Sequence, residues 1–323
     1  MTRMQRLLSL AAWGYLGCLL LLPLVWAWRG ERQWLLALLR YSPALCYLIP
    51  LALLLGLGLV TKKPIPRLPL VASALVVLAL YASPVLSLSS PGRGQLKVLT
   101  YNILAGRMQE SDELSRFLKR QNCDLILLQE VYTAPFRADP LPPIQAALGD
   151  FHMVRGGEVG ELVIFSRFPI RKWQEFELGY SRPGLWADVE MGEKVVRVYN
   201  VHYDHFDKLR TRGVRKLLRE TAMARFKQTN QLEAELSRWD GPVILAGDFN
   251  SPPDSDTPTR LRTRLQDAFA LSGRGLGQTF PSFFPLWRID YVYASRHFAV
   301  RQASPVRVTW SDHRPVRAEL DLI

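Results

Sequence analysis

Three long stretches without charge set the first 90 residues apart from the rest of the chain. Residues 7–28, 41–60 and 68–90 contain no Asp, Glu, Lys or Arg. Each stretch has about the 20 residues that a helix needs to cross the hydrocarbon layer of a bilayer. Helices of a soluble core are the alternative, but three of them in 90 residues would leave little polar surface. The pattern therefore predicts a membrane region over residues 1–90 with about three transmembrane helices.

The first stretch also has features of a signal peptide. Arg3 and Arg6 precede it, and residues 25–27 loosely fit a small-residue cleavage site. An uncut chain with its N-terminus inside crosses three times and a cut chain crosses twice from outside, so both leave residues 91–323 outside. The basic residues are evenly split between the two sides, so the positive-inside rule does not decide. We expect a multi-pass protein of the cell membrane with an extracytoplasmic catalytic domain.

A linker containing Gly and Pro, residues 91–95, precedes a different pattern in which short apolar or β-branched runs alternate with helical stretches. The predicted strands are residues 96–101, 124–129, 162–166, 195–201, 243–246, 289–294 and 316–320. The predicted helices are residues 111–121, with Ser111 as the N-cap, 211–236 and 257–269. This alternation predicts an α/β layered domain over residues 96–323.

Polar side chains recur where the predicted strands meet loops. In the segment 243–253, VILAGDFNSPP, Asp248 and Asn250 end an apolar run two positions apart, so both can face one object. Strand ends of α/β folds aim loop residues into one crevice. Each such residue alone is more often an ordinary turn or surface residue, but together they indicate a site. Its members are Asn102, Glu130, His202, Asp248, Asn250, Asp290, Asp312 and His313.

The net charge of +12 is unevenly distributed along the chain. Residues 1–90 hold eight Lys/Arg and one acid, Glu31, which leaves a net +5 for the rest. That modest charge weakens the case for a nucleic-acid partner that the total alone would suggest. The three cysteines, Cys18, Cys46 and Cys123, have no spacing typical of a disulfide framework or a zinc site.

Seven motifs, in their order along the chain, resemble those of the endonuclease/exonuclease/phosphatase superfamily, which includes DNase I-like nucleases, sphingomyelinases and inositol-phosphate phosphatases. The motifs are LTYNI, LLQEV, VIFSRFPI, YNVHYDH, LAGDFNSPP, RIDYVYAS and SDHRPV, and they span residues 99–316. The resemblance implies a DNase I-like α/β fold, a two-sheet sandwich flanked by helices, which is preceded here by the α-helical transmembrane region.

The resemblance also implies a divalent-metal site. Asn102 and Glu130 would help to hold the cation, with Glu130 as the principal ligand. Asp312 would complete the metal or water network. Oxygen ligands of this kind suit Mg²⁺ or Mn²⁺ better than zinc.

The other five residues carry catalytic roles by the same resemblance. Asp248 would orient or deprotonate the attacking water, and Asn250 would hold a phosphate oxygen. His313 would contact the scissile phosphate while Asp290 fixes its ring, and His202 would be a second residue in contact with the phosphate. A paired Asp–His also explains why a charged residue stands in the apolar strand RIDYVY, where an unpaired charge would be costly.

Three features bear on the substrate. A membrane anchor with a short linker keeps the site close to the lipid surface. The segment 279–290, TFPSFFPLWRID, is rich in aromatic residues and forms either a loop packed on the core or an apolar rim that touches lipid. The segment 207–220 is rich in Lys and Arg, which is typical of a solvated helix face but would also suit an anionic headgroup or a pyrophosphate.

Together these features favour a membrane-anchored, metal-dependent hydrolase of phosphate ester or pyrophosphate bonds. Its expected partners are the lipid bilayer and a phosphorylated lipid or polyprenyl pyrophosphate as substrate. Membrane-anchored members associated with glycopeptide resistance resemble the chain in layout. The alternatives are a metal-dependent surface nuclease, and a non-catalytic interaction module, against which the complete set of motifs argues.

Overall fold

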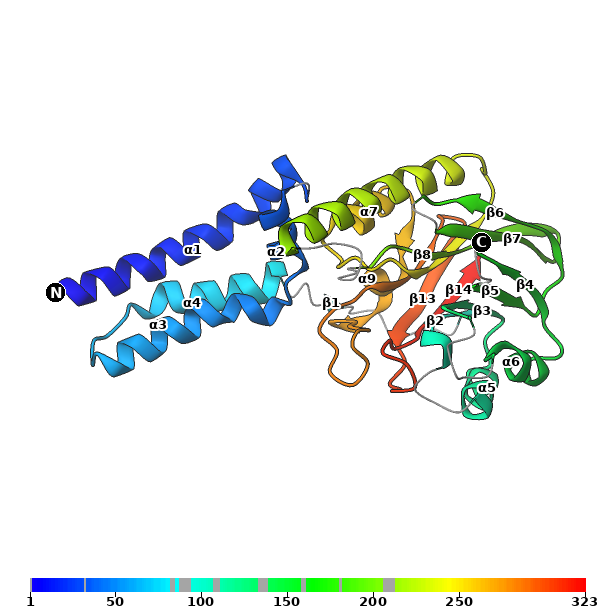
Figure 1. Ribbon diagram of the computed structural model, residues 1–323, viewed down its shortest axis with the longest axis horizontal. Helices are drawn as coiled ribbons and strands as arrows, with labels where there is room; N and C mark the ends of the chain where they lie inside the picture. The colour runs from blue at the N-terminus through cyan, green and yellow to red at the C-terminus, as the bar shows by residue number, and fades with distance from the viewer. Residues whose placement is uncertain are drawn as a thin grey trace.

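The computed structural model has two parts, an elongated helical segment that contains the N-terminus and a β sandwich that contains the C-terminus (Figure 1). The described residues are 2–31, 33–81, 85–86, 94–106, 111–132, 139–157, 161–179, 182–205 and 213–323.

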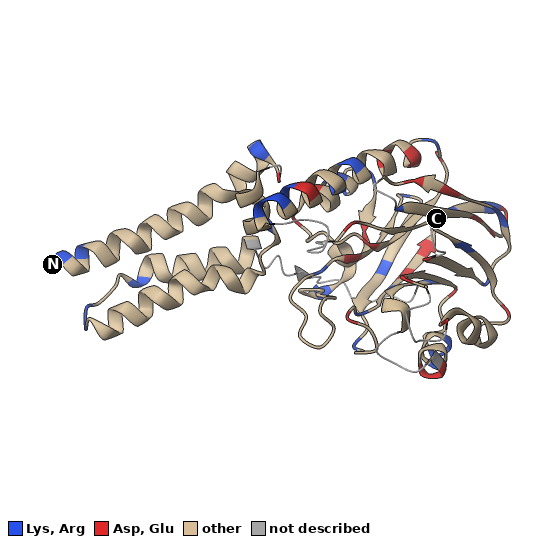
Figure 2. Ribbon diagram, in the orientation of Figure 1, with Lys and Arg blue, Asp and Glu red and all other residues tan. Residues whose placement is uncertain are grey.

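Helix α1 (Arg3–Arg29) forms one side of the helical segment. After a turn, α2 (Trp34–Tyr41) lies against the sandwich, and the chain returns through a 3₁₀ turn (Ala44–Leu48), α3 (Ile49–Val60) and α4 (Arg67–Val76), which continues as a π-helical turn (Val77–Tyr81). Charged residues mark mainly the ends of α1, α3 and α4 (Figure 2). Long apolar surfaces of this kind are suited to lipid and not to water.

Among the described residues, α1 alone is a single helix long and apolar enough to span a membrane. Most of the predicted second span, residues 41–60, forms the 3₁₀ turn and α3. Residues 44–60 count as a span only together with α2, to which they are bent by 99°. The prediction of one helix over residues 68–90 is wrong at its C-terminal end. There Val85–Leu86 form β1, which pairs with β11 (Arg274–Gly275) of the second part. Most of the predicted linker, residues 91–93, lies outside the described residues.

The second part is a sandwich of two six-stranded sheets, as predicted. In spatial order, the first sheet consists of β10 (Gln266–Asp267), β12 (Asp290–Ala294), β9 (Val243–Asp248), β8 (Lys194–His202), β7 (Pro183–Met191) and β6 (Ile170–Glu177). The second sheet consists of β13 (Phe298–Pro305), β14 (Val316–Leu322), β2 (Leu96–Asn102), β3 (Leu125–Gln129), β5 (Leu162–Ser166) and β4 (His152–Gly156).

Three apolar clusters hold the layers of the sandwich together. The central cluster lies between the sheets and includes Val98, Leu127 and Ile164 from one sheet and Val198 and Ile244 from the other. A second cluster joins one sheet to α5 (Ser111–Arg120) and α6 (Leu141–Ala147), and a third joins the other sheet to α7 (Val214–Leu236) and α8 (Asp256–Leu261). The inner strands of each sheet are therefore buried on both faces, which is why β3, β5 and β9 are almost continuously apolar.

The predicted helix over residues 257–269 is correct for residues 257–261 but wrong over residues 262–267. Helix α8 ends at Leu261, and after a turn the chain forms β10 and the short helix α9 (Ala268–Ser272). Both carboxylate oxygens of Asp267 lie 2.9 Å from the guanidinium of Arg288, and Asp267 also caps α9 by accepting a hydrogen bond from the backbone N of Ala270. These long-range contacts override the local helix propensity.

Candidate active site

The strand register brings the polar residues of both sheets to one edge. Asn102 is the last residue of β2 and lies beside Gln129, the last residue of the parallel β3, so Glu130 follows directly. His202 ends β8 opposite Asp248, which ends the parallel β9. Asp290 is opposite Asp248 in the antiparallel pair β12–β9, so the first residue of β12 reaches the same edge.

A cavity of about 310 Å³ opens at this edge, and it is lined by Leu104, Glu130, Tyr132, Glu161, Arg182, His202, His205, Asp248, Asn250, Phe280, Asp312 and His313. Asn102 and Asp290 stand directly behind that lining. Asn102 Nδ2 donates to Glu130 Oε1 (2.9 Å) and to Asp248 Oδ2 (3.2 Å), and Asp290 contacts the His313 ring. All eight residues named from the sequence thus lie around one cavity.

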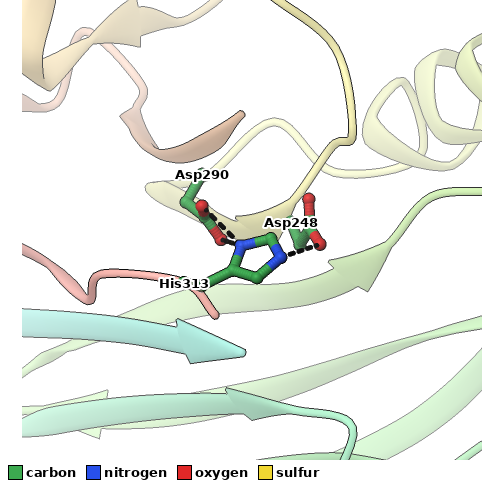
Figure 3. A group of neighbouring side chains, drawn as sticks. All are labelled: Asp248, Asp290 and His313. Carbon is green, nitrogen blue, oxygen red and sulfur yellow. Dashed lines mark hydrogen bonds and ion pairs between the residues drawn. The ribbon is translucent and has the colours of Figure 1, made fainter. Parts of the chain in front are cut away.

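His313 lies between two carboxylates (Figure 3). Its Nδ1 is 2.9 Å from Asp290 Oδ2, and its Nε2 is 3.6 Å from Asp248 Oδ2. Burial lowers the pKa of His313, but Asp290 and Asp248 outweigh it and raise the pKa to about 10. Because Asp290 contacts Nδ1 and Asp248 lies near Nε2, we interpret this trio as an acid–histidine–acid arrangement.

Gly247 allows Asp248 to reach this position. Its φ is +149°, and a Cβ built on it would lie 1.9 Å from the carbonyl oxygen of Val201 in the adjacent β8. Any side chain would therefore push β9 away from β8 and separate Asp248 from His202. Gly247, the glycine of LAGDFN, thus allows β8 and β9 to approach each other closely.

Arg182 fixes the orientation and tautomer of His202. Its guanidinium nitrogen lies 2.8 Å from His202 Nδ1, and because arginine only donates, that ring nitrogen accepts. The hydrogen of a neutral ring is then on Nε2, which lies 3.7 Å from both Glu130 Oε1 and Asp248 Oδ2. This buried atom has no hydrogen-bond partner among the described residues. It is a donor facing the cavity, where an anionic oxygen would satisfy it.

The donor set around Glu130 is suited to a hard divalent cation. Glu130 Oε1 accepts from Asn102, and Oε2 accepts from the hydroxyl of Tyr132 at 3.1 Å. Burial raises the pKa of Glu130, but the neighbouring His202, the Asn102 hydrogen bond and His313 together hold the pKa below its usual range. Asp312 lines the same cavity. An ionised carboxylate with further oxygen donors nearby fits Mg²⁺ or Mn²⁺, so the residues present fit the predicted metal.

Glu161 and Arg182 were not predicted from the sequence, and both line the cavity. Glu161 Oε2 lies 3.4 Å from the Arg182 guanidinium and 3.7 Å from His202 Nδ1. Glu161 directly precedes β5 and Arg182 directly precedes β7. Because β5 and β7 run antiparallel to β3 and β8, their first residues reach the edge where β3 and β8 end. Glu161 could have been noticed as the residue before the predicted strand 162–166, but β7 was not predicted, so Arg182 had no such signal.

The two-sheet sandwich and the carboxylate–histidine site at its edge define a phosphoester hydrolase of the DNase I-like class. The family description "Endonuclease/Exonuclease/phosphatase family" matches residues 99–313, and the chain belongs to this family. Enzymes of the family typically depend on divalent metal. A relative in Escherichia coli strain K12, the uncharacterized protein YbhP, is 29% identical over 260 residues, which cover 70% of this chain and 96% of the relative.

Solved structures agree on the fold. A mannosyl-6-phosphatase of Bacteroides thetaiotaomicron is 20% identical, with a TM-score of 0.58 over 70% of this chain and 99% of its own. Sphingomyelinase C of Streptomyces griseocarneus is 18% identical, with a TM-score of 0.52 over 69% of this chain and 98% of its own. At these identities the likeness concerns the fold and leaves the substrate to be argued from the site.

Proposed function

We propose that this protein is a membrane-anchored hydrolase that uses Mg²⁺ or Mn²⁺ to cleave a phosphate ester or pyrophosphate bond in a lipid-linked phosphate. The observation that carries the proposal is the cavity between Glu130 and His313 in a chain whose first helix is long and apolar enough to span a membrane. One side of the cavity offers oxygen ligands and the other offers a protonated imidazole, and hydrolysis of a phosphate ester needs both.

Each catalytic residue has a role that its contacts support. Glu130, Asn102 and Asp312 would hold the cation, which would neutralise charge on the non-bridging phosphate oxygens. His313, kept charged by Asp290, would donate to the phosphate as negative charge grows. His202 would donate from Nε2 to another phosphate oxygen.

Asp248 would orient the attacking water and accept its proton. Its Oδ1 accepts the backbone N–H of Asn250 at 2.8 Å, and its Oδ2 accepts Asn250 Nδ2 at 3.2 Å. Asn250 Nδ2 also donates to the carbonyl of Tyr203 at 3.0 Å. The predicted contact of Asn250 with a phosphate oxygen therefore requires Nδ2 to exchange one of these partners, and it stays a prediction.

The loop before β12 supports a lipid substrate. Phe283 is 73% exposed and Phe284 is 61% exposed, whereas Phe280 in the same loop packs against the His313 ring, with 4.9 Å between ring centroids. Exposed adjacent phenylalanines beside a catalytic residue are costly in water and stable in a lipid interface. The loop thus combines an inward face at the site with an outward face suited to a membrane surface.

We also propose that the protein lies in the cell membrane, crosses it several times and has its active site outside the cytoplasm. Alkaline phosphatase fused after Ile323 is expected to be active, because it folds only outside, and a fluorescent protein at the same place is expected to stay dark. A bright and phosphatase-negative fusion would place the sandwich in the cytoplasm and would exclude a substrate of the outer leaflet.

The substrate is tested with the purified full chain and Mg²⁺. The panel contains polyprenyl pyrophosphate, a lipid phosphate, sphingomyelin, inositol phosphates and DNA, each compared with the Asp248→Asn variant as background. Faster release of phosphate or headgroup from the lipids is the expected result. Preferred cleavage of DNA would favour the rival surface nuclease, and no turnover of any substrate would favour the non-catalytic module.

A further inference from the structure

Tyr41, the last residue of α2, connects the membrane segment to the active-site loop. Its carbonyl oxygen accepts a hydrogen bond from Trp287 Nε1 at 2.8 Å. Trp287 and Phe280 form an antiparallel bridge in which each backbone N donates to the carbonyl of the other, at 2.9 and 3.0 Å. Phe280 in turn packs against His313. Only two residues therefore separate a helix of the membrane segment from a catalytic histidine.

A second connection runs from Tyr41 to the other histidine. The guanidinium of Arg225, on α7, lies 4.8 Å above the Tyr41 ring, and its Nε donates to the carbonyl of Asp204 at 2.9 Å. Asp204 Oδ1 lies 3.3 Å from Arg182 Nε, and Arg182 orients His202. Tyr41 is thus connected through successive contacts to both His313 and His202.

The only acid of residues 1–90 holds Tyr41 in place. Glu31 lies in the turn between α1 and α2 and is 5% exposed. Its Oε2 accepts the Tyr41 hydroxyl at 2.7 Å, and its Oε1 accepts the backbone N of Asp256, at the start of α8, at 2.9 Å. A buried carboxylate with two donors from different parts of the chain is a specific contact, because leaving either donor unpaired is costly.

We propose that the turn from Glu31 to Tyr41 supports the active site, and that Tyr41 and Trp287 are positioning residues through which the membrane segment holds His313 and His202. The proposal rests on the proposed function for its catalytic part. Neither residue lines the cavity, so both act through other side chains.

The test uses the full chain in lipid nanodiscs with Mg²⁺ and bis(4-nitrophenyl) phosphate, a substrate without a lipid. Trp287→Phe keeps the ring against Phe280 but removes the N–H donor. We expect kcat to fall about tenfold with KM changed less than about twofold, because the groups are misplaced and not removed. Trp239→Phe is the matched control, since Trp239 Nε1 also donates to a backbone carbonyl, that of Pro242, at 3.2 Å. Equal kcat in the two variants would overturn the proposal.

A tyrosine pair tests the membrane side of the connection. Tyr41→Phe removes the hydroxyl that Glu31 accepts but keeps the carbonyl that Trp287 uses. We expect kcat to fall about threefold, less than for Trp287→Phe. Tyr47→Phe is the control, because the Tyr47 hydroxyl donates to Leu39 within the membrane segment. A loss in Tyr47→Phe as large as in Tyr41→Phe would contradict a specific role of Tyr41.

Hydrogen exchange gives a readout that does not depend on activity. Thr279 and Phe280 donate their backbone N–H to Trp287, Ser282 donates to Asp312, and Arg314 donates to Thr279. In Trp287→Phe these amides should exchange faster, and in Trp239→Phe they should not. Unchanged exchange would overturn the support itself, even if the wild type cleaved no substrate and the proposed function had failed. Faster exchange with unchanged kcat would overturn its catalytic part.

Discussion

Leu20 in α1 and Leu271 in α9 are almost equally exposed, at 51% and 53%. Leu271 is a single apolar residue on the surface of the sandwich, whereas Leu20 belongs to a helix whose outward face carries many more, including Leu10, Leu21 and Leu24. The sandwich buries its apolar residues between layers and gathers its polar residues at one edge. The helical segment presents its apolar residues outward, an arrangement that is costly in water.

The largest expected difference between the sandwich and the helical segment is the effect of removing the metal. Excess EDTA is expected to reduce phosphoesterase activity to background, and added Mg²⁺ or Mn²⁺ to restore it, because the carboxylate Glu130 and its neighbours form an oxygen-only donor set. Membrane association of the same sample should not change. Full turnover in excess chelator would refute the metal site.

The second prediction concerns the sandwich alone and compares the activity of its site with the stability of its core. Asp248→Asn and His313→Ala should each lower kcat by about 10²- to 10⁴-fold, because both groups act mainly in the transition state. The midpoint of thermal unfolding should stay near that of the wild type in Asp248→Asn, whereas His313→Ala should lower it without abolishing folding, because the buried Asp290 loses its partner. Near-normal turnover in either variant would mean that the catalytic centre lies elsewhere.

The third prediction compares arginine substitutions at Leu20 and Leu271, two leucines of almost equal exposure. Leu20→Arg places a charge in the middle of α1 and should raise the free energy of membrane insertion by about 3 kcal/mol. Leu271→Arg should change the stability of the sandwich by less than about 0.5 kcal/mol. Carbonate extraction of membranes and thermal unfolding measure the two effects. Equal retention of both variants in the membrane fraction would show that α1 is not the anchor.

The sequence predicted the layered fold because a strand buried on both faces has a recognisable run of apolar residues. Strands β3, β5 and β14 match their predicted ranges to within two residues. Strands β4, β6, β7 and β13 were missed. Strand β6 is exposed along most of its length, and alternation with polar residues is a weaker signal, whereas β7 is largely buried but its apolar run is interrupted by Asp188. The 99° bend between α2 and residues 44–60 was not predicted either, because it lies at the start of the uncharged stretch 41–60 and a search for apolar runs does not register bends.

Like the strands, the site residues were predictable where an apolar run reveals the end of a strand. Most site members, such as Asn102, Glu130 and Asp248, follow apolar runs, and the motif resemblance supplied their roles. Glu161 and Arg182 stand before strands, and their contribution depends on antiparallel pairing that no local pattern reveals. The contact of Glu31 with Asp256 joins residues 225 positions apart, so a lone acid in an apolar region gave no sign of its partner.

The last prediction concerns the place where the two parts meet. Burial is the main cause that raises the pKa of Glu31 from 4.5 to about 7, with Asp256 adding to it and Tyr41, the Asp256 backbone and Arg40 opposing it. The folded state therefore binds more protons than the unfolded state between these pH values, so stability falls as pH rises through the folded pKa. Between pH 6 and 8 the loss should be about 1 kcal/mol, which would lower the unfolding midpoint of the full chain by a few degrees.

Glu31→Gln keeps a side-chain acceptor for Asp256 and Tyr41 but cannot ionise, so its unfolding midpoint should vary less between pH 6 and 8 than that of the wild type. Glu177→Gln, at an exposed position of β6, is the matched control and should keep the wild-type slope. A wild-type slope in Glu31→Gln would mean that this carboxylate does not carry the contact. A flattened slope would show that the helical segment and the sandwich are joined through a buried polar group, because an apolar contact between them would not respond to pH.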